Sequence, residues 1–269
     1  MIKLLVTDLD GTLLDNEGHV SQANRDSIRT LAEMGIPTIA ATARSPRSTK
    51  RISSAAGLGP YAVCANGAVV FDLEASTVLS HDFIGAETAK EVVYLLRDTL
   101  PGAILAGEFL EEFYPEKGFF KRPLPGLEVA SISRLDDHLG NGMSKIIARV
   151  PGIDSETLRD TLRPILTRLV DITISGPDWI EFAAHGISKA SGLAHVFEIM
   201  GIDALDVAAI GDQRNDLTML AMVGHPLTVA NAHSDLFDLA GEVFSHANES
   251  GFAEVLRYVQ EAHSRPRSL

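Results

Sequence analysis

Short apolar runs alternate with helical patterns at both ends of this chain. In the first 65 residues the runs span 2–6, 38–41 and 61–65, and the helical patterns span 21–34 and 43–56. The first run does not alternate with polar residues, as expected for a strand buried on both faces. Strand, helix, strand, helix, strand is typical of a parallel sheet with helices on both faces, so the pattern predicts an α/β fold.

The last third of the chain repeats this order. Ser188 is a candidate N-cap for a helix over residues 188–200, Gly201 ends that helix, and further elements follow. We expect strands at 206–210 and 227–230 and helices at 217–223 and 251–262, with a frayed tail at 264–269.

The middle of the chain reads differently, with helices expected at 87–99 and 155–169 and strand-like pieces at 103–106, 145–150 and 171–175. We interpret residues 81–184 as a second, α+β domain inserted into the first. Residues 1–80 and 185–269 then form a discontinuous core of about 165 residues, an ordinary domain size.

The net charge and the cysteine content argue against several classes of protein. The chain has 269 residues and a net charge of −13, which argues against general nucleic-acid binding because phosphate backbones need clustered Lys and Arg. The single Cys64 excludes an internal disulfide and is better explained as a small core residue than as a nucleophile. No signal peptide is evident, and Gly and Pro interrupt the long uncharged stretches, so we expect a cytoplasmic protein without membrane spans.

Polar residues follow five of the expected strands. The carboxyl ends of parallel strands meet at one edge of a sheet, where ligands of such sheets bind, so these side chains are expected to converge. They are Asp8 and Asp10, Thr42, Asn66, Asp212 with Asn215 and Asp216, and Asn231.

Asp8 and Asp10 are residues of the types that a nucleophile and a general acid–base catalyst require. Asp8 follows a buried strand, so one carboxylate can attack a reacting atom while the other, two residues on, moves protons. The alternative is that Asp10, Gly11 and Thr12 only form a turn. Four carboxylates at one edge (Asp8, Asp10, Asp212 and Asp216) would repel each other, and a hard dication with oxygen ligands, Mg²⁺, resolves this. Asp216 could instead be an acidic helix cap.

Basic and hydroxyl side chains complete the candidate site. Lys189 is expected in the first turn of its helix, where the dipole disfavours a cation, which indicates a nearby anion unless the side chain is simply solvated. Thr42 either caps a helix beginning at Ala43 or, with free amides, binds an anion. Arg44 and Arg47 could add positive charge or lie on the surface, the latter being favoured for Arg47.

Together these residues resemble the four motifs of the haloacid dehalogenase-like superfamily. The motifs are Asp8-Leu9-Asp10-Gly11-Thr12, Thr42, Lys189, and Gly211-Asp212 followed by Asn215-Asp216. Asn66-Gly67-Ala68, Gly186–Lys189 and Asn231-Ala232 resemble its Cof-type branch. The resemblance implies a Rossmann-like parallel sheet core with a large inserted cap.

The resemblance also implies roles for individual residues. Asp8 would be the nucleophile that forms an aspartyl-phosphate, and Asp10 the acid and base whose backbone carbonyl also binds Mg²⁺. The implied metal ligands are Asp8, Asp10 and Asp212, with Asp216 supporting the waters of the metal. The implied phosphate-binding residues are Thr42, Ala43, Lys189 and Asn215; the family usually has Gly where this chain has Ala43.

The expected function is therefore Mg²⁺-dependent hydrolysis of a small phosphorylated metabolite, such as a sugar phosphate, by a monomer or homodimer. A phosphotransferase or phosphomutase with the same intermediate, a receiver-like protein and a non-catalytic phosphometabolite-binding protein remain alternatives. Side chains of the cap that could contact the leaving group are Glu108, Phe109, Tyr114, Lys117, Lys121 and Arg122.

Overall fold

The computed structural model describes residues 1–120, 129–176 and 178–264. The chain divides into two compact units, residues 1–80 with 188–269 and residues 81–187. Lys121, Arg122 and most of the expected C-terminal tail lie outside the described residues. Within these, no helix is long and apolar enough to cross a bilayer.

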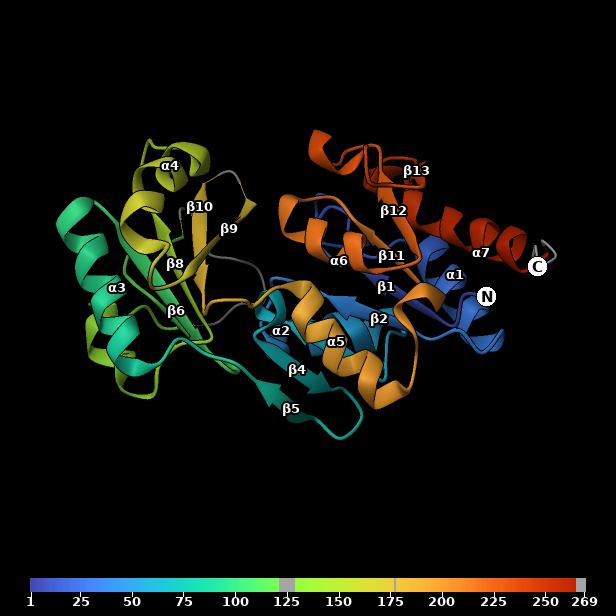
Figure 1. Cartoon of the computed structure of the whole chain (residues 1–269), viewed down its shortest axis with the longest axis horizontal. Helices are drawn as coiled ribbons and strands as arrows, with labels where there is room; N and C mark the ends of the chain where they lie inside the picture. The colour runs from blue at the N-terminus through green and yellow to red at the C-terminus, as the bar shows by residue number, and fades with distance from the viewer. Residues whose placement is uncertain (121–128, 177, 265–269) are drawn as a thin grey trace. The chain divides into compact units, whose positions relative to one another are not determined.

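The first unit contains one eight-stranded sheet in the order β13-β12-β11-β1-β2-β3-β4-β5 (Figure 1). The neighbours from β13 to β3 pair in parallel, and β3 pairs with β4 antiparallel. The strands are β1 (Leu4–Thr7), β2 (Thr38–Ala41), β3 (Tyr61–Cys64), β4 (Val69–Asp72), β5 (Thr77–His81), β11 (Val207–Gly211), β12 (His225–Val229) and β13 (Glu242–Phe244).

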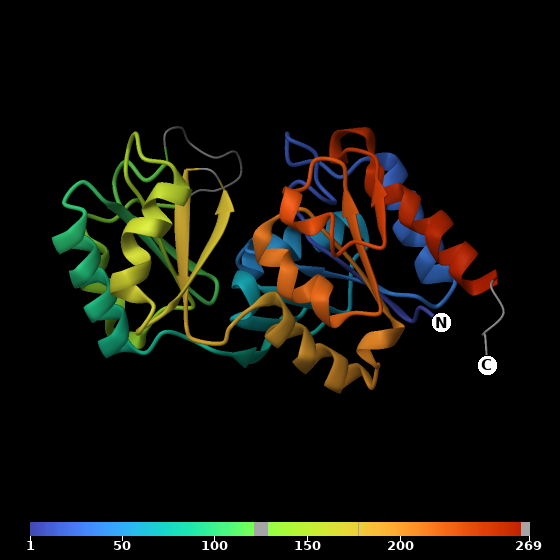
Figure 2. The same cartoon turned by 45° about the horizontal axis from the view of Figure 1, so that its top comes forward.

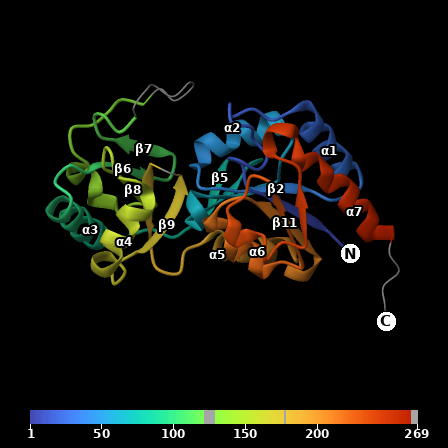
Figure 3. The same ribbon diagram turned by 90° about the horizontal axis from the view of Figure 1, so that it is seen from above.

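Helices cover both faces of this sheet, as the apolar runs predict. Figure 3 shows α5 (Lys189–Met200) and α6 (Leu217–Met222) on one side and α1 (Gln22–Glu33), α2 (Pro46–Ala56) and α7 (Val255–Ser264) on the other. Leu4, Val6 and Ile39 of the strands pack with Leu193 and Leu220 of α5 and α6 in a continuous apolar core. Cys64 is buried at the end of β3, in keeping with its interpretation as a core residue.

The second unit contains a five-stranded antiparallel sheet in the order β7-β6-β8-β10-β9. Figure 2 shows α3 (Ala86–Thr99) and α4 (Ser155–Leu166) side by side, and their apolar residues pack on one face of this sheet. The strands are β6 (Ile104–Phe109), β7 (Glu112–Pro115), β8 (Lys145–Arg149), β9 (Asp171–Gly176) and β10 (Trp179–Ala183). The expected fold class, a parallel α/β core with an inserted α+β cap, is confirmed.

Several element boundaries differ from the sequence-based expectation. The second helix begins at Pro46 with Ser45 as N-cap, so Thr42 caps no helix. Residues 251–254 form a 3₁₀ turn before α7 rather than part of one helix. Strands β4, β5, β7, β10 and β13 were not expected; β5 is largely exposed and β13 has three residues, so neither has a strong apolar signal.

Candidate active site

The buried Asp8 carboxylate lies directly after β1, at the carboxyl edge of the parallel sheet. Its backbone N–H donates to the carbonyl of Ile210 (2.9 Å), which extends the β1–β11 pairing by one step and fixes the position of the side chain. The Lys189 ammonium lies 2.6 Å from Asp8 Oδ1 and 2.6 Å from Asp216 Oδ1. The nucleophile candidate and the expected cation are therefore in direct contact.

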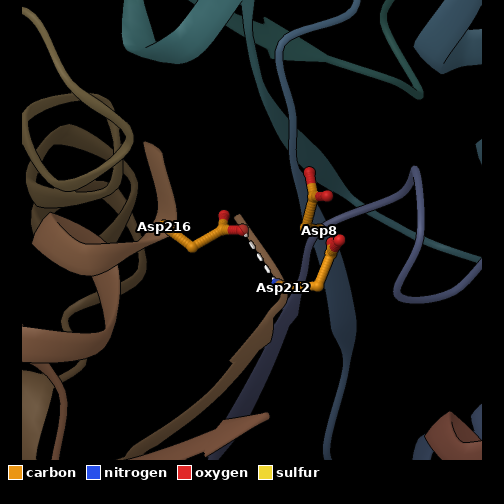
Figure 4. Close-up of side chains that lie close together, drawn as sticks. All are labelled: Asp8, Asp212 and Asp216. Carbon is orange, nitrogen blue, oxygen red and sulfur yellow. Dashed lines mark hydrogen bonds between the residues drawn. The ribbon is translucent and has the colours of Figure 1, made fainter. Parts of the chain in front are cut away.

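Three carboxylates, those of Asp8, Asp212 and Asp216, converge here with oxygen atoms within 4.8 Å of one another (Figure 4). Asp216 Oδ2 accepts from the backbone N–H groups of Asp212 (3.0 Å) and Gln213 (2.9 Å), so Asp216 closes its own turn as well as pairing with Lys189. The alternative interpretation of Asp216 as a cap is thus correct in part. One of its oxygens accepts from the Lys189 ammonium and the other accepts from the backbone of the turn.

Burial changes the acid–base properties of this cluster. Desolvation, with the negative charges of Asp216 and Asp212, raises the pKa of Asp8 well above its ordinary value, despite Lys189. Desolvation and Asp216 raise the pKa of Asp212 to about 6. Burial alone would lower the pKa of Lys189, but Asp216 and Asp8 outweigh it and raise that pKa.

This donor set fits a hard divalent cation. Three carboxylates face one ammonium, and all the donors are oxygen atoms, which Mg²⁺ prefers. Two of the carboxyl groups have raised pKa values, so an additional positive charge would relieve their repulsion. Asp212 is held in place by Thr12 Oγ1, which donates to Oδ1 (2.7 Å), and by Gln213 Nε2, which donates to Oδ2 (3.2 Å).

Asp10 is arranged differently from the other acids. Its carboxylate, 55% exposed, accepts from Arg44 Nε (2.7 Å) and Nη2 (2.5 Å). Its side chain does not belong to the carboxylate cluster of the described residues. The expected metal contact of Asp10 is through its backbone carbonyl and stays a prediction.

Gly11 permits the turn that follows Asp10. Its φ of +79° is a left-handed conformation, and a Cβ there would lie 2.6 Å from Asp212 Oδ2. Asn231 fixes the same turn, because its Nδ2 donates to the Gly11 carbonyl (2.7 Å) and its Oδ1 accepts from Ala247 N–H (2.9 Å). The turn can therefore approach Asp212 closely without a side chain between them.

The expected phosphate-binding residues lie on adjoining loops. Thr42 is buried after β2, its Oγ1 accepts from Arg44 N–H (3.1 Å), and its carbonyl accepts from Asn66 N–H (3.0 Å). Asn215 Nδ2 donates to Asn66 Oδ1 (3.0 Å). Ala43 is half-buried between Thr42 and Arg44. These contacts connect the ends of β2, β3 and β11.

The loop after β3 holds an unusual backbone conformation. Ala65, Asn66 and Gly67 have successive φ values of +50°, +58° and +106°. Left-handed non-glycine residues are uncommon and cluster at functional sites. A Cβ on Gly67 would lie 1.9 Å from the Ser188 carbonyl, so glycine allows this loop to pack against the start of α5. Ser188 caps α5 and Lys189 opens it, as expected from the sequence.

The candidate leaving-group residues of the second unit occupy varied environments. Glu108 is buried with Glu181 and Lys145, and Phe109 and Tyr114 pack against the apolar core of that unit. Tyr114 also donates to Glu112 and lies against the His138 ring. Lys117 is exposed.

Four residues that position the side chains and turns of the site were not predicted from the sequence to make these contacts. Thr12 is expected from the sequence only as part of a turn, but its hydroxyl donates to Asp212. Arg44 is expected either to add positive charge or to lie on the surface, and it binds Asp10. Gln213 and Asn231 hold Asp212 and the Gly11 turn. Only their position beside the Asp motifs could have indicated these contacts.

Comparison with known proteins identifies the family. Residues 5–256 match the family model of haloacid dehalogenase-like hydrolases. Relatives include a 5-amino-6-(5-phospho-D-ribitylamino)uracil phosphatase of Bacillus subtilis (26% identical; 96% of this chain, 95% of that protein). Others are an HMP-PP phosphatase of Serratia proteamaculans (27%; 96% and 95%) and a phosphoglycolate phosphatase of Methanothermobacter thermautotrophicus (27%; 95% and 98%).

Solved structures agree on the fold. A haloacid dehalogenase-like hydrolase from Bacteroides thetaiotaomicron superposes with a TM-score of 0.81 (21% identical; 96% of this chain and 100% of that chain). A subclass IIB sugar phosphatase of the same superfamily gives 0.83 (19%; 96% and 99%). The resemblance seen in the motifs is confirmed, and the expected enzyme class agrees with the activities of the relatives. The chain belongs to the haloacid dehalogenase-like hydrolases, in their Cof-type branch.

Proposed function

We propose that this hydrolase is a magnesium-dependent phosphatase that cleaves a small phosphomonoester through an aspartyl-phosphate on Asp8. The observation that carries the proposal is the buried Asp8 carboxylate at the end of β1, 2.6 Å from Lys189 and clustered with Asp212. The phosphatase activities of three relatives over almost the whole chain support the same reaction class.

The first half-reaction transfers the phosphoryl group to the enzyme. An Asp8 carboxylate oxygen bonds to phosphorus as the bond to the leaving oxygen breaks, and Asp10 gives its proton to that oxygen. Lys189, Thr42, the Ala43 amide and Asn215 would hold the phosphoryl oxygens, with Lys189 offsetting their negative charge.

The second half-reaction releases phosphate. Asp10, now ionised, takes a proton from water as the water oxygen bonds to phosphorus and the bond to Asp8 breaks. Asp8, Asp212 and the Asp10 backbone carbonyl would hold Mg²⁺, with Asp216 supporting its waters. When bound, this ion would neutralise charge on the phosphoryl oxygens.

The inserted domain would select the leaving group. Three relatives act on a phosphoribityl uracil derivative, on HMP-PP and on phosphoglycolate, which differ widely outside the phosphate. We therefore expect a small phosphorylated metabolite here, chosen by side chains in residues 81–184, in a cytoplasmic setting.

The test is phosphate release with Mg²⁺ from p-nitrophenyl phosphate and a panel of sugar and organic-acid phosphates. We expect turnover that Asp8→Asn and excess EDTA both abolish, and an acid-stable, base-labile phosphoprotein on brief mixing. Turnover by Asp8→Asn would refute the scheme. Transfer to an added acceptor in preference to water would instead identify a phosphotransferase. A stable phosphoprotein without turnover would favour a receiver-like protein, and binding alone a non-catalytic one.

A further inference from the structure

Arg44 approaches Asp10 with a geometry that a single ion pair does not require. Its Nε and Nη2 donate to different oxygens of one carboxylate, at 2.7 and 2.5 Å, which is the two-bond arrangement specific to a guanidinium. Asp10 is otherwise an exposed side chain on a turn, free to rotate about two bonds. The fork fixes both its direction and the plane of its carboxylate.

Arg44 is itself fixed on three sides. Its backbone N–H donates to Thr42 Oγ1 (3.1 Å), and its carbonyl accepts from the Ala65 N–H (2.9 Å). Its Nη1 donates to Ser48 Oγ in α2 (3.1 Å). The guanidinium is therefore placed by the same loops that carry the expected phosphate-binding residues.

Stability does not account for this arrangement. The Asp10 side chain is 55% exposed and that of Arg44 is 29% exposed. Ion pairs this close to solvent contribute little to folding, because water screens the attraction and two long side chains must be ordered. The pair is thus expendable for the fold, and variants of it should remain folded.

We propose that Arg44 is a positioning residue that aims the Asp10 carboxyl group at the leaving oxygen and then at the attacking water. This inference rests on the proposed function and assigns to Arg44 a part in both half-reactions. When Asp10 carries its proton, one oxygen still accepts from the fork while the other presents the O–H to the leaving group. When Asp10 is ionised, both oxygens accept, and the lone pair facing the water takes its proton.

The test compares Arg44→Ala and Arg44→Lys with the wild type in rapid mixing with p-nitrophenyl phosphate and Mg²⁺. Nitrophenolate leaves without help from an acid, so phosphorylation of Asp8 should persist in Arg44→Ala. The water step needs an aimed Asp10, so steady-state kcat should fall about 10- to 100-fold, part of the ~10²–10⁴ supplied by acid–base catalysis. We expect a nitrophenol burst larger than that of the wild type and partial recovery in Arg44→Lys. KM should fall by about the same factor as kcat, because kcat/KM depends only on binding and on the unchanged phosphorylation step.

A double-mutant cycle with Asp10→Asn shows whether Arg44 acts through Asp10. We expect Arg44→Ala to have almost no additional effect on kcat once Asp10 is replaced. The matched control is Arg47→Ala, an exposed arginine three residues further on in the first turn of α2, which should leave the burst and kcat unchanged. Thermal unfolding of each variant verifies that it is folded.

Two results would overturn the proposal. A rise in KM with kcat unchanged would mean that Arg44 binds substrate, and equal losses with and without Asp10 would mean that it acts independently. Failure of the proposed function has a different signature, namely no phosphoprotein in the wild type or full turnover by Asp8→Asn.

Discussion

Among the described residues, each unit of this protein buries one lysine between carboxylates, but the two clusters are built differently. In the second unit Lys145 lies 3.1 Å from Glu181 and 3.6 Å from Glu108, which are on strands flanking β8, and Glu108 is its direct cross-strand partner. In the first unit Lys189 opens a helix and binds Asp8 and Asp216, 181 and 27 residues away, at 2.6 Å.

The Lys145 cluster forms within one sheet, between side chains of paired strands. The Lys189 cluster forms where the ends of several strands and the start of a helix meet. Lys145 and its partners are neighbours because three strands pair, which places one ammonium between two carboxylates of the flanking strands. A third carboxylate, that of Asp212, lies in the same cluster as the two that bind Lys189. Burial raises the pKa of both Asp8 and Asp212. The cluster around Lys189 has three carboxylates for one ammonium, whereas that around Lys145 has two. A bound divalent cation would neutralise the larger excess of negative charge.

Replacing Lys189 should produce the largest effect. Lys189→Met removes the cation that lies between Asp8 and Asp216, so kcat/KM for p-nitrophenyl phosphate should fall by about 10³. Two buried carboxylates would lose their partner, which should lower the free energy of unfolding in EDTA by about 3 kcal/mol. Steady-state kinetics and urea unfolding measure both, with exposed Lys50→Met as control. Near-normal activity would show that Lys189 is only structural.

Replacing Lys145 should affect stability more than chemistry. Lys145→Met leaves Glu108 and Glu181 buried without their ammonium, and the free energy of unfolding should fall by about 2–3 kcal/mol. Phosphorylation of Asp8 by p-nitrophenyl phosphate should change less than about fivefold, because Lys145 belongs to the other unit. Lys117→Met, an exposed change in the same unit, is the control. A loss of activity as great as that of Lys189→Met would remove the distinction between the two clusters.

The smallest effect is expected in the pH dependence of stability. The pKa of Asp212 is about 6 when folded and near 3.8 when unfolded, so between these values the folded state binds more protons. Asp212 therefore lowers the free energy of unfolding progressively as pH rises from about 4 to 6, and its effect is constant above that pH. Asp212→Asn should be more stable than the wild type by about 1–3 kcal/mol at pH 7 in EDTA, and equal to it near pH 4.

Urea unfolding at a series of pH values measures this difference, with exposed Asp238→Asn as control. Added Mg²⁺ should stabilise the wild type at pH 7 and have little effect on Asp212→Asn, because a ligand stabilises only the state that binds it. A difference between the two proteins that does not vary with pH would show that Asp212 is not desolvated as described.

The sequence predicted the strand ends better than the side-chain contacts between them. Buried parallel strands are uninterrupted apolar runs, so the residues after them could be placed on one edge, and the Ser188 cap marked the position of Lys189. The predicted start of the second helix, at Ala43, was wrong because Thr42 also resembles an N-cap. Ser45 followed by Pro46 is the better signal for a helix start. Contacts such as those from Thr12 to Asp212 and from Arg44 to Asp10 depend on loop conformation, which no periodicity encodes.

The position of β1 has a consequence for biosynthesis. This strand pairs with β2 on one side and β11 on the other, yet β11 is translated roughly 200 residues later. Until the ribosome has made β11, one edge of β1 has no partner and is open to wrong pairing. Asp212 and Lys189 also emerge only after the whole insertion, so a nascent chain cannot bring Asp8 together with these charge partners before the insertion and β11 have been made.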